Sequence, residues 1–175
     1  MGGRTKRLKK QSDGSPDQSL PETVILFLDE SLHNCRPVHA ALAGASITIE
    51  RHGAYYPPGL PDDQWLPDIG TKRWAMLTCD QKIRYNELER QKIVRYKIKE
   101  FVFAHGNMSG LMMGAALTKA AERMKSLIRE HEPPFIAYIS QSGNVVVRYD
   151  KHGSVHDRQK KARSTETDSN PDVVS

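Results

Sequence analysis

The sequence is poor in cysteine, with only Cys35 and Cys79 among its 175 residues. Two cysteines make no disulfide framework, and this scarcity is typical of proteins kept in the reducing cytosol. The chain also lacks any apolar run of the roughly 18 residues that a membrane-spanning helix needs. No apolar stretch follows the basic N-terminal segment, as it would in a secretory signal. These absences predict a cytoplasmic protein that does not contact a membrane.

A strong excess of one charge is also missing from the central part of the chain. The net charge is +5, but residues 21–150 hold sixteen basic and fifteen acidic groups. Residues 1–20 and 151–175 are polar, lack the apolar spacing of folded elements and are expected to be disordered tails. The remaining length suits one domain with its own core, so we predict a single domain over residues 21–150. The basic pI by itself does not indicate nucleic-acid binding.

Strand and helix patterns alternate between the two predicted tails. Short apolar runs typical of strands lie at residues 24–28, 46–49, 74–77, 101–104, 135–139 and 145–149. Segments with helical spacing or helix boundary residues lie at 32–43, 61–70, from about 80 onward, and 108–129. This alternation predicts an α/β fold, in which helices sandwich a central, mostly parallel sheet of four to five strands in three layers. The last two strands are expected to form a C-terminal hairpin.

Carboxylates follow two of the predicted strands. Asp29 and Glu30 come after the first strand and Asp80 after the third, while Asp62 and Asp63 open the helix between the second and third. The carboxyl ends of parallel strands meet at one edge of a sheet, so these groups are expected to come close together. Clustered carboxylates repel one another unless a cation sits among them, and Mg²⁺ or Mn²⁺ prefers such ligands. A metal there would activate water for attack on a phosphodiester.

Each of these acids has a simpler interpretation when it is taken singly. Aspartate commonly caps a strand end or a helix start, with no part in metal binding. This interpretation is weakest for Asp29 and Asp80 together, because both follow predicted parallel strands. Asp68 lies inside the predicted helix, where a solvated surface charge is the ordinary role.

The order of these segments resembles the PIN-like domain family. An apolar strand that ends in Asp-Glu, as at residues 24–30, is similar to the opening of PIN-like domains. The segments that continue the pattern are 62–70, 74–80, 81–84, Glu89, 106–110 and 133–136. The resemblance covers about residues 23–149. It implies a PIN-like fold and a ribonuclease that depends on Mg²⁺ or Mn²⁺, often the toxin of a toxin–antitoxin pair.

The resemblance also implies roles for particular residues. The matching positions make Asp29 and Asp80 the central metal ligands, Glu30 and Asp63 their neighbours, and Asp62 and Asp68 second candidates. The first four are the predicted catalytic residues. Asn107 follows the fourth predicted strand, where PIN nucleases usually offer another acid. Its amide oxygen can bind a metal but adds no charge, so the metal would be held less tightly.

The stretch after Asp80 is strongly basic. Lys82 and Arg84 are close to Asp80 in sequence, and we expect them to hold a phosphate of the substrate. The alternative is a solvated helix whose basic side chains pair with Glu87 and Glu89.

Two other functions stay open beside the ribonuclease. One is a PIN-like module that binds RNA or protein without cutting, which the amide at Asn107 favours modestly. The other is a metal-dependent phosphohydrolase for a small substrate. For a toxin, the expected partners are RNA, an antitoxin protein that blocks the acidic pocket and, as in many PIN-like proteins, a second copy of the chain in a homodimer.

Overall fold

The structure, a computed structural model, describes residues 23–156, so the predicted tail at residues 1–20 lies outside the described residues, as does most of the second tail. The described strands are β1 (Ile25–Leu28), β2 (Thr48–Arg51), β3 (Ala75–Thr78), β4 (Lys99–Phe103), β5 (Phe135–Ile139), β6 (Val145–Asp150) and β7 (Gly153–Ser154). The described helices are α1 (Arg36–Gly44), α2 (His52–Tyr55), α3 (Asp62–Lys72), α4 (Glu87–Arg95) and α5 (Gly110–Glu130), with a 3₁₀ helix η1 (Lys82–Arg84).

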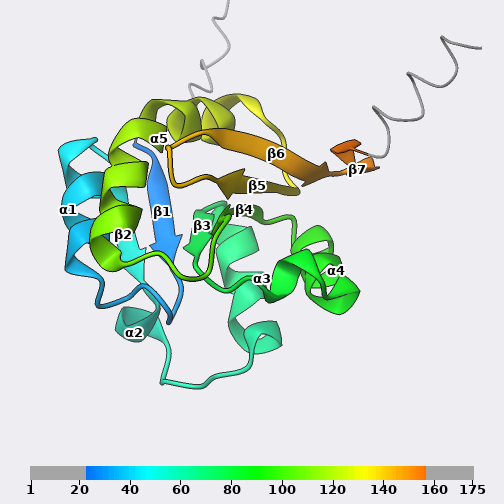
Figure 1. The fold of residues 1–175 in the computed structure, drawn as a ribbon. Coiled ribbons are helices and arrows are strands. Elements are labelled where there is room, and N and C mark those ends of the chain that lie inside the picture. The colour runs from blue at the N-terminus through cyan, green and yellow to red at the C-terminus, as the bar shows by residue number, and fades with distance from the viewer. Residues whose placement is uncertain (1–22, 157–175) are drawn as a thin grey trace, which may run out of the picture.

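The strands form one sheet in the order β2-β1-β3-β4-β5-β6-β7 (Figure 1). The first five strands in this order are parallel, and β6 and β7 add to the edge in antiparallel orientation. Helices α1 and α5 cover one face of the sheet, and α3 and α4 cover the other. The predicted three-layer α/β/α fold with a C-terminal hairpin is therefore confirmed. The sheet is larger than the four to five strands expected, partly because β7 forms within the segment predicted as a tail.

The central strands are buried on both faces, as their continuous apolar runs predict. All four residues of β3 are buried. On β4, Phe101 and Phe103 pack with α1 and α5, whereas Val102 between them packs with α3 and α4. Two cores thus lie on opposite faces of one sheet, and the loops at its edge carry the polar groups.

Helix α3 does not end at Gly70, where the sequence predicted its end. It continues to Lys72, and Arg73 then adopts a left-handed backbone conformation with φ of 56°. Gly70 is needed for a close approach instead, because a Cβ atom there would lie 2.1 Å from the carbonyl oxygen of Tyr96.

Helices α1 and α4 begin several residues later than their sequence patterns suggested. Helix α1 begins at Arg36, with Pro37 in its first turn. Proline is tolerated there because the backbone N–H groups of the first turn have no partner within the helix. The helix expected near residue 80 is preceded by η1, and α4 itself begins at Glu87. Asn86 fixes that start, because its Oδ1 accepts a hydrogen bond from the amide of Leu88 at 3.0 Å. No helix among residues 23–156 is long and apolar enough to cross a membrane.

Candidate active site

Asp29 and Asp80, which follow strands β1 and β3, are linked through one threonine. The hydroxyl of Thr78 donates a hydrogen bond to Oδ2 of Asp29 at 2.5 Å and accepts one from the amide of Asp80 at 2.9 Å. Because β1 and β3 are parallel neighbours, their carboxyl ends lie at the same edge of the sheet. The structure therefore brings these two aspartates together.

Asp29 is the most closely held of the acidic side chains at this edge. Its Oδ1 accepts hydrogen bonds from the amide of Ser31 at 3.0 Å and from the Ser31 hydroxyl. Burial raises the pKa of Asp29, although the hydrogen bonds from Ser31 and Thr78 act in the opposite direction. The nearby charge of Asp80 raises this pKa further. Asp29 is thus fixed in orientation and disposed to gain a positively charged neighbour.

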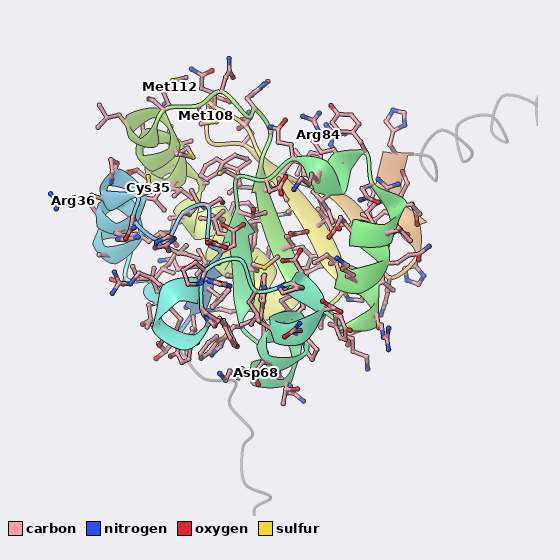
Figure 2. The ribbon with its side chains drawn as sticks, turned by 90° about the horizontal axis from the view of Figure 1, so that it is seen from below. Cys35, Arg36, Asp68, Arg84, Met108 and Met112 are labelled. Carbon is pink, nitrogen blue, oxygen red and sulfur yellow. The ribbon has the colours of Figure 1, made fainter. Side chains whose placement is uncertain are left out.

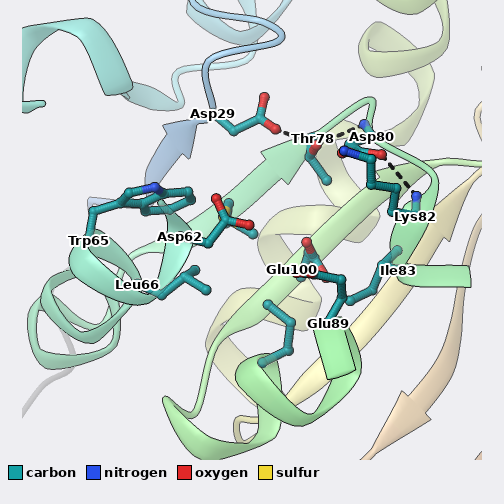
Figure 3. Close-up of a pocket in the computed structure, with 12 residues that line it drawn as sticks. Asp29, Asp62, Trp65, Leu66, Thr78, Asp80, Lys82, Ile83, Glu89 and Glu100 are labelled. Carbon is teal, nitrogen blue, oxygen red and sulfur yellow. Dashed lines mark hydrogen bonds and ion pairs between the residues drawn. The ribbon is translucent and has the colours of Figure 1, made fainter. Parts of the chain in front are cut away.

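A cavity of about 120 Å³ opens beside these residues, between the sheet and helices α3 and α4. A buried water needs about 10–15 Å³, so the cavity has room for several waters or a hydrated cation. Its carboxylates come from five separate segments and are Asp29, Asp62, Asp80, Glu89 and Glu100 (Figure 3). A second cavity shares Asp29, Asp62 and Asp80 and adds Glu30 and Ser31. We call the first cavity, together with the residues that line it, the acidic cavity.

The first turn of α3 presents only one of its two aspartates to the acidic cavity. Asp62 lines both cavities, while the exposed Asp63 lines neither. Burial raises the pKa of Asp62, and the positive charge of Lys92 opposes this effect. The rotation of α3 about its axis therefore places Asp62 at the cavity and Asp63 away from it, which the sequence alone did not distinguish.

Two other predicted ligands lie away from the acidic cavity. Asp68 accepts a hydrogen bond from the hydroxyl of Tyr56 at 2.8 Å and pairs with Lys72 at 3.2 Å, on the outer side of α3 (Figure 2). Asn107 is exposed in the loop after β4 and lines neither cavity. The solvated role fits Asp68, and the amide of Asn107 does not face the carboxylates.

Sequence reasoning missed Glu100 altogether and treated Glu89 mainly as a partner for basic side chains. Glu89 does pair with Lys92, at 3.1 Å, but it also lines the acidic cavity. Glu100 lies on β4 and is only 3% exposed. Its one signal in the sequence is a charged residue directly before the apolar run at 101–104, a pattern that predicts a strand beginning after it.

The two predicted phosphate-binding residues differ in how free they are. The side chain of Lys82 is 77% exposed, lines the acidic cavity and pairs loosely with Asp80 at 3.4 Å. The guanidinium of Arg84 donates a hydrogen bond to the carbonyl oxygen of Ala104 at 2.7 Å and lies over the rings of Tyr85 and Tyr138. Lys82 is therefore available to a ligand, whereas Arg84 is engaged within the protein.

The acidic cavity suits a divalent cation in the chemistry of its donors. Carboxylate oxygens are the ligands that Mg²⁺ and Mn²⁺ prefer, and Oε2 of Glu100 is buried without a hydrogen-bond partner. As they stand, however, no three His, Cys, Asp or Glu among residues 23–156 form a group that could hold a metal ion.

Comparison with protein families matches residues 24–105 to a PIN like domain. This span contains every carboxylate of the acidic cavity. Neither the curated proteins nor the solved structures gave a match to the chain. The family match and the α/β/α fold together support a PIN-like domain over residues 24–105, and domains of this kind are generally nucleases.

Proposed function

We propose that this protein is a metal-dependent endoribonuclease and that the acidic cavity is its active site. The observation that carries the proposal is the convergence of five carboxylates on one cavity within a PIN-like domain. Such a concentration of like charge is unfavourable for folding and is common where a protein binds a cation or performs acid–base chemistry.

The residues that would hold Mg²⁺ or Mn²⁺ are Asp29 and Asp80, with Asp62 and Glu30 beside them. We assign Asp62 in place of the predicted Asp63, because Asp62 is the aspartate of α3 that lines the cavity. A bound divalent cation supplies an activated water and stabilises charge on the phosphodiester.

The chain's own side chains orient the ligands. Thr78 and Ser31 fix the carboxylate of Asp29 through hydrogen bonds, as outer residues commonly do for metal ligands. The exposed ammonium of Lys82, at the rim of the acidic cavity, can hold a substrate phosphate. A loop that presents a cation beside an acidic pocket lets the negatively charged RNA approach despite the carboxylates.

Single-stranded RNA is the substrate that we propose. RNA follows from the family resemblance, and the surface adds one supporting feature. Tyr85, which is 80% exposed, follows η1 and lies close to Lys82 in sequence. An exposed aromatic ring near a cation is the arrangement on which unpaired bases stack.

The biological setting that we propose is the toxin half of a toxin–antitoxin pair in the cytoplasm. An antitoxin would block the acidic cavity by placing a basic side chain among its carboxylates, because charge-assisted hydrogen bonds to carboxylates are strong. Pairing of two copies of the chain is part of the same proposal.

The test is cleavage of labelled single-stranded RNA with Mn²⁺ or Mg²⁺, by the unaltered protein and by Asp29→Asn and Asp80→Asn. Glu122→Gln on α5 is the matched control, because Glu122 is 85% exposed and α5 covers the opposite face of the sheet. We expect cleavage that requires metal, disappears in both aspartate variants and persists in the control.

One alternative function has an observation in its favour. Among residues 23–156 no ready three-donor metal group exists, which favours a module that binds RNA without cutting it. Folded protein that binds several RNAs but cleaves none of them with either metal would replace our proposal with this one.

A further inference from the structure

Glu100 occupies a strand position that should be apolar. On the same face of the sheet, its partners in register are Met76 on β3 and Ile136 on β5, and both belong to the core under α3 and α4. The next residue of β4 on this face, Val102, belongs to the same core. A valine or isoleucine at position 100 would continue this surface at no electrostatic cost.

Within residues 23–156, nothing offsets the burial of the Glu100 carboxylate oxygen Oε2. The residue is 3% exposed, and its Oε2 makes no hydrogen bond. Burial and the charges of Asp29 and Asp62 raise the pKa of Glu100 well above its ordinary value. Moving an unpaired carboxylate out of water is among the most unfavourable changes in folding.

The two lysines near the acidic cavity lie against carboxylates other than that of Glu100. Lys82 pairs with Asp80, and Lys92 pairs with Glu89. Among residues 23–156 no basic side chain pairs with Glu100, whose carboxylate is directed into the cavity from β4 (Figure 3). A positive charge that pairs with Glu100 would therefore come from outside the described residues.

We propose that Glu100 is a cation-binding residue at the floor of the acidic cavity, where it supplies a carboxylate oxygen to a divalent cation of the Mg²⁺ or Mn²⁺ class. This inference rests on the proposed metal-dependent function and adds to it a ligand from within a central strand. It explains why a buried strand position carries an unpaired acid, and it places the cation deeper than the strand-end residues alone would.

The experiment measures binding of Mn²⁺ to the 175-residue chain by titration calorimetry, and the rise in melting temperature that Mn²⁺ causes. Glu100→Gln keeps the side-chain shape and removes the charge. We expect its affinity for Mn²⁺ to fall about tenfold or more, because fewer charged ligands bind the ion less tightly. Without metal, we expect Glu100→Gln to melt at an equal or higher temperature than the unaltered protein, because the unpaired buried charge is gone.

Two further variants make the result decisive. Glu122→Gln on α5 should bind Mn²⁺ as the unaltered protein does. Glu100→Asp keeps the charge on a shorter side chain and should retain more affinity than Glu100→Gln; it also serves if Glu100→Gln fails to fold. Equal affinity for Mn²⁺ in the unaltered protein and in folded Glu100→Gln would overturn the inference, as would an equal loss of affinity in Glu100→Gln and Glu122→Gln.

Binding and cleavage separate this inference from the proposed function. Mn²⁺ binding that depends on Glu100 but leads to no RNA cleavage would support the inference and count against the nuclease. Metal-dependent cleavage with Mn²⁺ affinity unchanged in Glu100→Gln would do the reverse.

Discussion

Thr78 donates a hydrogen bond from its Oγ1 atom to Oδ2 of Asp29, which is 49 residues away in the sequence. The same hydroxyl accepts a hydrogen bond from the amide of Asp80. One side chain therefore fixes both the carboxylate after β1 and the backbone after β3. Neither strand alone determines the position of its aspartate relative to the other.

We predict that Thr78→Val weakens catalysis far more than it weakens the fold. Valine has nearly the same shape but cannot donate to Asp29, so the carboxylate loses a fixed orientation. Loss of such an outer hydrogen bond typically lowers metal affinity or activity by about 10–100-fold. The free energy of unfolding should fall by only about 1–2 kcal/mol. RNA cleavage rates and chemical denaturation measure the two effects.

Thr118→Val is the matched control for this substitution. The Thr118 hydroxyl donates to the carbonyl oxygen of Gly114 within α5, so its loss removes a hydrogen bond away from the acidic cavity. Cleavage by Thr118→Val should equal that of the unaltered protein. A Thr78→Val variant with full activity would show that the hydroxyl does not position Asp29 for catalysis.

Substitution of Lys82 should affect RNA binding, whereas substitution of Arg84 should affect the stability of the fold. Lys82→Ala removes an exposed cation, so we expect weaker binding of single-stranded RNA and a salt dependence reduced by about 0.7 in the slope of log K against log salt. Arg84→Ala removes the hydrogen bond to the Ala104 carbonyl oxygen and should instead lower the free energy of unfolding by about 1–3 kcal/mol. Fluorescence anisotropy at several salt concentrations and denaturant titration measure these effects.

Lys119→Ala on α5 controls for the loss of any surface charge. It should change neither the affinity nor the salt slope, because α5 covers the face of the sheet opposite the acidic cavity. An Arg84→Ala variant that keeps its stability but loses RNA affinity would return Arg84 to the phosphate-binding role.

The strand-end aspartates could be predicted from sequence because their placement follows from chain topology alone. An apolar run ending in an acid indicates a buried strand and its carboxyl end, and parallel strands carry such ends to one edge. Asp29 and Asp80 satisfy this pattern. Asp62 and Asp63 do not, because the rotation of a helix about its axis decides which of two neighbours faces the sheet.

Glu100 could not be predicted from local pattern for a different physical reason. A single acid before an apolar run looks like the boundary of a strand, and its burial depends on α3 and α4, which come from separate segments of the chain. Gly70 illustrates the same limit. It resembles a helix stop, but the carbonyl oxygen of Tyr96 is what requires it.

Gly70→Ala should destabilise the fold, because the new Cβ atom would lie 2.1 Å from the carbonyl oxygen of Tyr96. The backbone would have to shift to relieve the overlap, at a cost of about 1–3 kcal/mol or more. Gly44→Ala is the matched control on α1, since nothing lies within 4 Å of its added Cβ. It should be neutral or stabilising by up to about 1 kcal/mol. Equal unfolding free energies for the two variants, from denaturant titration, would contradict the close approach.

The contribution of Asp68 to stability should depend on pH in a defined direction. Hydrogen bonds from Tyr56 and Lys72 lower the pKa of Asp68 below its ordinary value of 3.8. A carboxyl group whose pKa is lower in the folded state stabilises the fold above its unfolded pKa, and this contribution is lost as the pH falls through the folded pKa. The unaltered protein should therefore melt at a higher temperature than Asp68→Asn at about pH 7, and the difference should shrink below about pH 4.

Tyr56→Phe tests the cause of this pH dependence. It removes the phenolic donor at 2.8 Å from Asp68 while Lys72 stays in place. In the Tyr56→Phe background, Asp68→Asn should lower the melting temperature less than it does in the unaltered protein, because part of the interaction is already gone. High salt should reduce the remaining difference, since the Lys72–Asp68 pair is exposed to solvent. An Asp68→Asn effect that is the same in both backgrounds would mean that the tyrosine does not stabilise the charged carboxylate.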